Sequence, residues 1–547
     1  MRWLVTLLSL GVSLPTVAAA QELNPQAFPV GEEALGLGGA YTGRAHDASA
    51  AWYDPGGLVF GRSGSVSASL SIGLADRYEL AGTSPGDFDL TYDDALGVPF
   101  YVGASIQLGE EAPDGSHRHA LAATTFSPNR SQRQFAVHRG EDGGAVQSLS
   151  VRRADRTRFY GLSYALRVLD RLGVGLSAFL SIRSFEHEEN EIVADATLAA
   201  RSTRATLDAE GLVFRVGAFW RIERHVSLGL TFQPPGIELG ARSTVASTRA
   251  GAGPGGVDTA SERQEEIGAR SPIPWRLRLG VSWTPLSSVI LNADVALVGP
   301  LGSEDDPIER FRLEGDVPSG VPGRYVAAHY WREWTVDGAI GGRVVVDDRV
   351  PISAGFFTSL SSAPALADGP TDVYRPDRLD IFGASVSVGY RSAEFDFAIG
   401  VAGSLGFGRG LRASPASGVE APTWEPTDLS SQTLYVFVSG AGGAITAVSR
   451  RLVREILGTD AVETGEDDDG DERGRGGSGA PPSNDADGPQ GGGSSGGASS
   501  PDGPRPNHPA PSDPGDPGPV DPGPDDPGAD EPGPIEGGAP ATAAGGD

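Results

Sequence analysis

Cysteine is absent from this chain of 547 residues, so no disulfide holds its fold together. Histidine is scarce, with eight residues, and neither the G-x-S-x-G hydrolase motif nor the H-E-x-x-H metalloprotease motif occurs. The nearest match to the second motif, His187-Glu188-Glu189-Asn190, lacks the second histidine. We therefore expect no enzyme activity, no catalytic residue, no metal and no cofactor, with a membrane hydrolase as the alternative.

Long apolar runs are also missing. After the first twenty residues, no run reaches the roughly 18 apolar residues that a membrane-spanning helix needs, which excludes such a helix. An excess of basic residues is missing too, because the formal net charge is −29. An acidic balance of this size argues against a nucleic-acid partner. Much of the acidic excess follows Gly458, so it says little about the part of the chain that folds.

The two ends differ in composition from the rest of the chain. Residues 1–20 contain a basic Arg2, an apolar run and three final alanines, which predicts a secretory signal peptide cut before Gln21. An N-terminal membrane anchor is the alternative. Residues 445–458 predict one short amphipathic helix. Residues 459–547 are rich in proline, glycine and aspartate, and we expect a disordered acidic tail because they cannot bury a core.

Residues 62–444 are dominated by a period of two, as expected of β-strands with one apolar face. One such apolar set is Trp275, Leu277, Leu279, Val281 and Trp283. Short connections, such as residues 170–173, alternate strictly with long polar loops, such as residues 236–272. This alternation is typical of outer-membrane barrels. We predict an all-β fold, a transmembrane antiparallel β-barrel of about fourteen strands with both termini in the periplasm.

Aromatic side chains fall near the predicted strand ends, as the two interfacial girdles of a membrane barrel require. On this topology Trp220 and Trp283 belong to the periplasmic girdle. The predicted outer girdle consists of Phe159, Tyr160, Trp275, Trp331 and Trp334.

Residues 21–61 precede the barrel wall and are rich in small side chains. Within them, GLGGAYTGRAHDASAAWYDPGGLVF (residues 36–60) is not a dinucleotide-binding loop, because Tyr41 occupies the position of the third glycine. A fourteen-stranded barrel is wide enough to need a plug, and glycines would let a plug pack its backbone closely on the wall. We therefore predict that residues 21–61 fold back into the barrel as a hatch.

This stretch resembles the N-terminal hatch of the FadL-type outer-membrane transporters of long-chain fatty acids and aromatic hydrocarbons. The family pattern is G-x-G-x-A-Y-x-G, then D-A-S-A, an aromatic pair and N-P-A-G-L. Asp54 and Gly56 replace the family's Asn and Ala; Asp54 can still cap a turn or a helix start, but it lacks the Asn amide. The hatch motif of this chain comprises Gly36, Gly38, Tyr41, Gly43, Asp47, Ser49, Tyr53, Asp54, Pro55 and Gly56.

The resemblance implies passive uptake of hydrophobic molecules across the outer membrane of a Gram-negative-type bacterium, with long-chain fatty acids as the first expectation. A channel for aromatic or other uncharged hydrocarbons is the alternative, and a structural or tethering protein acting through its acidic periplasmic tail is the second. The expected partners are the ligand, outer-membrane lipid and lipopolysaccharide, and the barrel-assembly machinery, and we expect a monomer. Family members bend the third strand to open a side exit, and Pro128 would disrupt strand pairing there.

Strand alternation also assigns side chains to the lumen. We predict that Arg183 and Arg215, on neighbouring strands, hold a ligand carboxylate through charge-assisted hydrogen bonds. Phe179, Phe185 and Phe219 face the same way and are predicted to contact an acyl chain. The alternative is a hydrated, salt-bridged lumen. The other charged residues assigned to the lumen are Arg167, Arg276, Arg278, Arg343, Asp294, Asp337 and Asp396.

Overall fold

The computed structural model describes residues 24, 28–61, 64–80, 100–112, 116–140, 146–194, 198–309, 311–312, 329–371, 375–392, 395–414 and 423–442. All of these residues belong to one compact unit, Met1–Glu463. The predicted signal peptide, the helix at residues 445–458 and the acidic tail at residues 459–547 lie outside the described residues and stay predictions.

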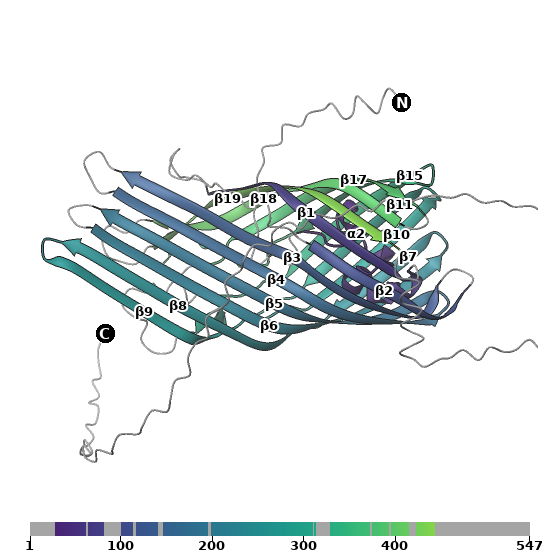
Figure 1. Cartoon of the computed structure of the whole chain (residues 1–547), viewed down its shortest axis with the longest axis horizontal. Helices are drawn as coiled ribbons and strands as arrows, with labels where there is room; N and C mark the ends of the chain where they lie inside the picture. The colour runs from purple at the N-terminus through teal and green to yellow at the C-terminus, as the bar shows by residue number, and fades with distance from the viewer. Residues whose placement is uncertain are drawn as a thin grey trace, which may run out of the picture. The chain divides into compact units, whose positions relative to one another are not determined.

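In the described part of the chain, fourteen antiparallel strands close into a barrel, because β1 pairs with both β2 and the last strand, β19 (Figure 1). This confirms the predicted transmembrane barrel and its strand number. The strands of the wall are β1 (Ser65–Leu80), β2 (Phe100–Glu111), β3 (His117–Gly140), β4 (Val146–Leu169), β5 (Leu172–Ala194), β6 (Leu198–Glu223), β7 (Val226–Gln233), β10 (Arg276–Leu286), β11 (Val289–Val298), β15 (Thr335–Val346), β16 (Val350–Ser359), β17 (Arg378–Arg391), β18 (Phe395–Ser414) and β19 (Thr423–Gly442).

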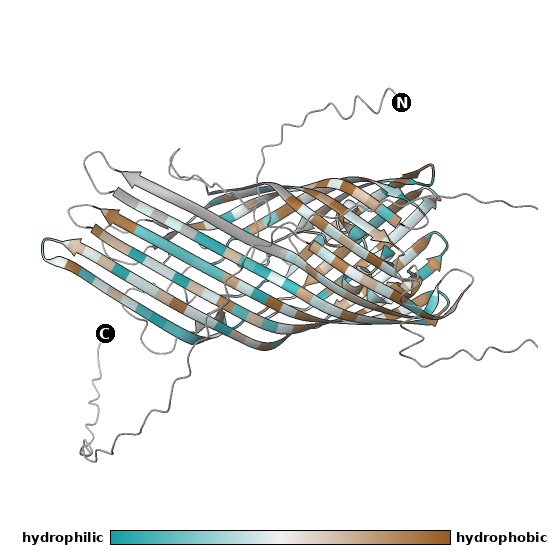
Figure 2. Ribbon diagram, viewed as in Figure 1, coloured by the Kyte–Doolittle hydropathy of each residue, from teal (hydrophilic) through white to brown (hydrophobic). Residues whose placement is uncertain are grey.

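Apolar and polar residues alternate along many wall strands (Figure 2), and many of the large apolar side chains are exposed on the outer face of the wall. On β10, Leu277 and Leu279 are 38% and 48% exposed, whereas Arg276 next to them is 6% exposed. An apolar outside around a closed hydrogen-bonded ladder is what a lipid bilayer requires. Within the described residues, no helix has the length and apolar character needed to cross a membrane.

The predicted aromatic girdles are right for some residues and wrong for one. Trp220, Trp283 and Trp334 are about half exposed on the outer face, at 49%, 50% and 58%. Phe159 was expected beside them but is 7% exposed and packs among aromatic rings inside the barrel. The physical reason is the two-residue period of the strand, since Tyr160 takes the outward position and so turns Phe159 inward.

The two ends of the barrel differ, as the loop lengths predicted. At the short-turn end, tight connections such as Asp170-Arg171 and Arg224-His225 join neighbouring strands. At the opposite, long-loop end, β3 to β6 extend past the other strands, and β8 (Ile237–Gly253) and β9 (Gly256–Ala269) continue this sheet from β6 (Figure 1). Proline has no N–H to donate to a ladder, so Pro234 and Pro235 separate β7 from β8.

Short strands and helices complete the described fold. At the long-loop end, β12 (Ile308–Glu309) pairs with β14 (His329–Tyr330), and β13 (Phe311–Arg312) pairs with β9. The hatch segment forms four short helices: α2 (Glu32–Gly36), η1 (Thr42–Arg44), α3 (Ala50–Tyr53) and η2 (Pro55–Phe60).

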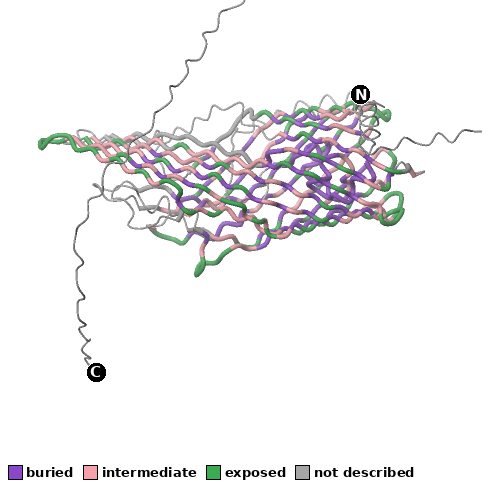
Figure 3. Tube along the Cα trace, turned by 60° about the horizontal axis from the view of Figure 1, so that its bottom comes forward, coloured by how far each residue is buried: buried purple, intermediate pink, exposed green. Residues whose placement is uncertain are grey.

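The hatch lies inside the barrel, and buried residues gather in the half that ends in the short turns (Figure 3). The wall binds the hatch backbone directly. Asp294 accepts hydrogen bonds from the N–H groups of Tyr41 and Thr42, and the Thr231 hydroxyl donates to the Tyr53 carbonyl. Asp54 caps η2 by accepting from the Gly56 N–H at 2.9 Å, the capping role that the sequence left open for it.

Candidate functional site

A cavity of about 150 Å³ lies in the lumen beside the hatch. Its hatch side is the indole of Trp52, which packs at 5.2 Å from the ring of Phe159. Its other apolar lining comes from Pro128, Ala209, Val213, Pro272, Ile273, Pro274 and Val298. The charged lining residues are Arg153, Asp155, Arg183, Glu210, Arg215, Arg276, Arg332 and Asp377. The cavity therefore presents an apolar wall and a wall rich in guanidinium groups to the same small volume.

Arg183 lines this cavity, but its charge is already matched. Its Nε and Nη2 donate to the two carboxylate oxygens of Asp155 at 3.0 and 2.6 Å. A third bond runs from Nη1 to the Ser271 hydroxyl at 3.1 Å. A bidentate pair of this kind is among the stronger side-chain interactions. A ligand carboxylate would have to compete with Asp155 for this guanidinium.

Arg215 differs, because within the described residues no carboxylate pairs with it. The side chain is 3% exposed. Its Nε donates to the Gln233 amide oxygen at 3.0 Å, and its Nη1 donates to the backbone carbonyl of Trp52 in the hatch. The guanidinium carbon also lies 3.3 Å from the centre of the Trp52 ring system. Arg215 therefore contacts the hatch and lines the cavity with the same group.

A second cation lies one strand away. Gln233 on β7 pairs in register with Arg276 on β10, so Gln233 separates the guanidinium groups of Arg215 and Arg276. Arg276 has Asp337 as an ionic neighbour, at 3.5 Å. The positive charge of Arg215 is thus flanked by a second arginine, and an anion entering the cavity would reduce the repulsion between them.

The three predicted phenylalanines do not line the cavity. Phe179 is fully buried behind it, where its ring packs 5.7 Å from Trp52. Phe185 lies in a separate cluster with Leu207 and Val245. Phe219 lies near the short-turn end, 5.5 Å from Phe60 of the hatch. The inward direction of these side chains was predicted from alternation, but their height along the barrel axis depends on strand tilt and register, which alternation does not give.

The sequence reasoning missed most of the cavity lining. Trp52 was noted only as one of an aromatic pair, and Phe159 was placed outside. Pro272, Ile273 and Pro274 precede β10 and turn into the lumen from a loop, where no strand period could assign their direction. Of the prolines that line the cavity, the sequence analysis discussed Pro128, and β3 and β4 shift register between Phe126 and Asn129 around it.

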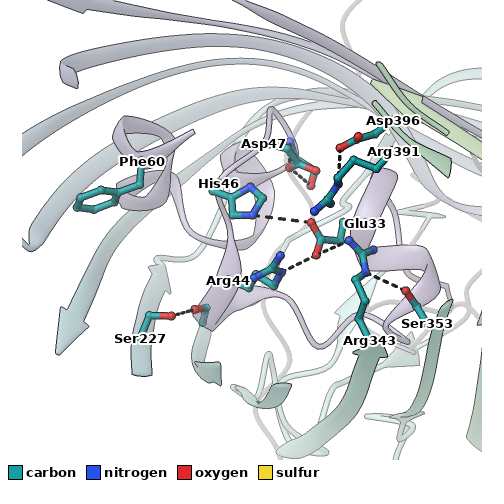
Figure 4. A network of polar contacts seen from close by, with 12 residues as sticks. Glu33, Arg44, His46, Asp47, Phe60, Ser227, Arg343, Ser353, Arg391 and Asp396 are labelled. Carbon is teal, nitrogen blue, oxygen red and sulfur yellow. Dashed lines mark hydrogen bonds and ion pairs between the residues drawn. The ribbon is translucent and has the colours of Figure 1, made fainter. Parts of the chain in front are cut away.

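A buried ionic network joins the hatch to β15 of the wall (Figure 4). Glu33 accepts from the Arg44 Nε at 2.5 Å and pairs with the Arg343 Nη1 at 2.8 Å. Arg343 in turn donates to the Ser353 hydroxyl at 2.9 Å. Burial alone would raise the pKa of Glu33, but Arg343, Arg44 and His46 lower it well below its usual range. Glu33 is therefore a carboxylate throughout the physiological range and joins the hatch to β15.

Glycines of the wall lie where the hatch backbone crosses it. A side chain added at Gly355 of β16 would meet the backbone of Leu37 and Gly38, and one added at Gly217 of β6 would meet Asp54. Gly38 itself has φ +62°, in the left-handed region that favours glycine. Gly38 of the hatch motif and Gly355 of the wall therefore allow the same close contact between their two backbones.

A Gly355→Ala substitution tests this contact. Its methyl group would overlap Leu37 and Gly38 backbone atoms, which cannot rotate away, so we expect the docked hatch to lose roughly 1–3 kcal/mol. The expected readout is a higher ion conductance of the purified protein in planar lipid bilayers. Gly338→Ala is the matched control, because the nearest atom there is 3.8 Å from the added methyl. Equal conductance of the two variants would contradict the close contact.

Comparison with known proteins finds similar folds but no relative by sequence. No protein-family model and no curated protein matches the chain. Among solved structures, a FadL homologue of Pseudomonas aeruginosa has a TM-score of 0.48 and 14% identity, covering 78% of this chain and 99% of that one. The CymD monoaromatic hydrocarbon channel has a TM-score of 0.45 and 13% identity, covering 76% and 98%.

A third similar structure is the toluene transporter TbuX of Ralstonia pickettii, with a TM-score of 0.44 and 14% identity over 76% of this chain and 98% of that one. The family that the hatch sequence resembles is also the family named for the first of these three structures.

Proposed function

We propose that this chain is a FadL-type outer-membrane transporter for the passive uptake of hydrophobic molecules. The apolar outer face supports a place in the membrane, and the hatch supports control of passage through the lumen. The observation that carries the proposal is the cavity beside the hatch, where Trp52 packs against both the ring of Phe159 and the buried guanidinium of Arg215. We assign the long-loop end to the cell exterior and the short-turn end, with the acidic tail, to the periplasm.

For the substrate, we propose long-chain fatty acids. The proposal rests on Arg215, a buried cation that has no carboxylate partner in the described part of the chain and that lies against an apolar wall. A guanidinium in such a place is suited to a carboxylate head, while the apolar wall is suited to the chain that follows it. In this mechanism the ligand enters from the long loops, its head reaches Arg215, and the hatch then moves. The ligand then leaves sideways, where Pro128 at the register shift between β3 and β4 places a candidate exit next to the cavity, or past the hatch toward the short-turn end.

An uncharged aromatic hydrocarbon is the second candidate, favoured by the size of the cavity. About 150 Å³ is the volume of an engineered cavity that holds one benzene molecule, so a small ring would fill this one without any movement of the hatch. A long acyl chain needs more room and would have to extend toward the long-loop end. The third candidate, a tethering protein acting through its acidic tail, depends on residues outside those described.

Uptake by intact cells tests the function. The host lacks its own fatty-acid transporter, expresses this chain, and is checked for heat-modifiable barrel in its outer membrane. We expect labelled long-chain fatty acid to enter faster than in cells with empty vector. Uptake of labelled toluene but not fatty acid would select the second candidate, and uptake of neither by a correctly inserted barrel would overturn the transport proposal.

A further inference from the structure

A second cavity opens at the short-turn end, on the other side of the hatch from the lumen cavity. Its volume is about 440 Å³. Arg44 and His46 of the hatch form its inner wall, and Phe60 and Ser227 lie beside them (Figure 4). The turns between β4 and β5 and between β6 and β7 form its rim. We call this cavity the vestibule.

The vestibule is rich in arginine. Four arginines and two acids line it: Arg44, Arg171, Arg221 and Arg224, with Asp170 and Glu223. The charge of Arg44 is matched by Glu33 within the hatch. Arg171 and Arg224 are exposed on the two rim turns, and Arg171 uses its Nη1 only to donate to the Ile222 carbonyl at 2.9 Å. Asp170 and Glu223 lie on the same two turns, so the excess positive charge of the vestibule is that of Arg221, while Arg171 and Arg224 offer exposed guanidinium donors at the rim.

The floor of the vestibule is apolar. Phe219 is 3% exposed, lines the cavity and packs on Phe60 of the hatch. The guanidinium carbon of Arg221 lies 4.1 Å from the centre of the Phe60 ring, so the two form a cation–π contact that brings positive charge next to an aromatic ring. Val226 adds a second apolar side chain. An apolar floor below an arginine rim suits a ligand with an anionic head and an apolar body.

Hatch residues line both cavities, Trp52 the lumen cavity and Arg44 and His46 the vestibule. The Ser227 hydroxyl, on the vestibule wall, donates to the Gly43 carbonyl of the hatch at 2.6 Å, and the N–H of Thr42 bonds to Asp294. A molecule that passes the hatch at this point emerges between Phe219 and the arginine rim. An uncharged hydrocarbon would gain nothing from the rim, whereas a carboxylate would.

We propose that the vestibule is a second binding site, which holds the carboxylate of the transported hydrophobic acid on the short-turn side of the hatch. This inference rests on the proposed function, because its ligand is the proposed substrate. The vestibule would be a second ligand site, separate from the lumen cavity. We also predict that fatty acids and hydrocarbons differ in how they leave the protein, since only the acid is retained there.

The absence of cysteine allows a direct test by protection of single introduced thiols. Thr284→Cys places a thiol on the vestibule wall, and Thr157→Cys places one on the lumen cavity. The full chain is reconstituted in lipid nanodiscs and treated with N-ethylmaleimide, which is uncharged, in the presence of decanoate or decanol. At a decanoate concentration about nine times its dissociation constant, we expect labelling of Thr284→Cys to slow about tenfold. Decanol should not slow it.

A rim variant and a matched control identify the group responsible. With Arg171→Gln and Arg224→Gln, decanoate should no longer protect Thr284→Cys, while Thr157→Cys stays protected. Arg349→Gln removes the same charge from another turn at the short-turn end, outside the vestibule, and should leave both results unchanged. Protection of Thr157→Cys without protection of Thr284→Cys would overturn the vestibule site alone. Protection at neither thiol would overturn the fatty-acid substrate as well.

Discussion

We expect a Glu33→Gln variant to conduct ions through a planar lipid bilayer far better than the parent chain. The substitution keeps the size of the side chain but removes the carboxylate that two arginines share, Arg44 at 2.5 Å and Arg343 at 2.8 Å. Both arginines are largely buried. Breaking a buried ion pair from one side leaves the other charge without compensation, at a cost of about 3–5 kcal/mol.

That cost falls on the docked hatch, because Arg44 belongs to the hatch and Arg343 to the wall. A loss of about 3–5 kcal/mol corresponds to roughly two to three and a half powers of ten in the fraction of open barrels. The strands themselves keep their ladder, so the barrel should still be heat-modifiable on a denaturing gel. A folded Glu33→Gln barrel with the conductance of the parent would show that the network does not hold the hatch.

Glu32→Gln is the matched control for this result. Glu32 is the neighbouring residue on the same short helix, and it has no ion pair within the described residues. Burial, Asp47 and Glu33 raise the pKa of Glu32 well above its usual range, so its carboxyl group is readily protonated in place. Replacing it by a neutral amide should therefore change the conductance little.

Arg215→Met separates the two candidate substrates. Methionine keeps the length and apolar stem of the side chain but removes the charge and all donors. Hydrogen bonds to a charged group contribute about 1.5–3 kcal/mol, so fatty-acid affinity should fall by roughly 10- to 100-fold. Uptake of labelled toluene should be unchanged or faster, because the variant also loses the bond from Arg215 to the Trp52 carbonyl of the hatch. The measurement is the ratio of fatty-acid to toluene uptake in the same cells.

The ratio is needed because Arg215 contacts the hatch as well as the cavity. If both uptakes change in parallel, Arg215 acts through the hatch only and the carboxylate site lies elsewhere. The control is the double variant Arg183→Gln with Asp155→Asn, which removes an ion pair from the cavity wall without changing its net charge. We expect this variant to keep the ratio of the parent chain, because a carboxylate ligand gains little from a guanidinium that Asp155 already occupies.

Much of the architecture was determined by the sequence. Alternation on β10 fixes Arg276 inward and Leu277 outward, because successive side chains of a strand point to opposite faces. The short turns and long loops fix antiparallel neighbours, and a lipid-embedded sheet must close. The composition and motif of residues 21–61 predicted a hatch inside the barrel. Asp54 caps η2, as its carboxylate allows.

The site itself was decided by tertiary structure. Alternation could not say that Phe185 and Phe219 lie at different heights from the cavity, because height depends on strand tilt and on register across many strands. It could not show that Asp155 neutralises Arg183, which depends on the register between β4 and β5. It also could not show that Arg215 binds the hatch, because Trp52 and Arg215 are 163 positions apart in the chain. The period of two determines which side of the wall a residue faces, and only the closed barrel determines what it meets there.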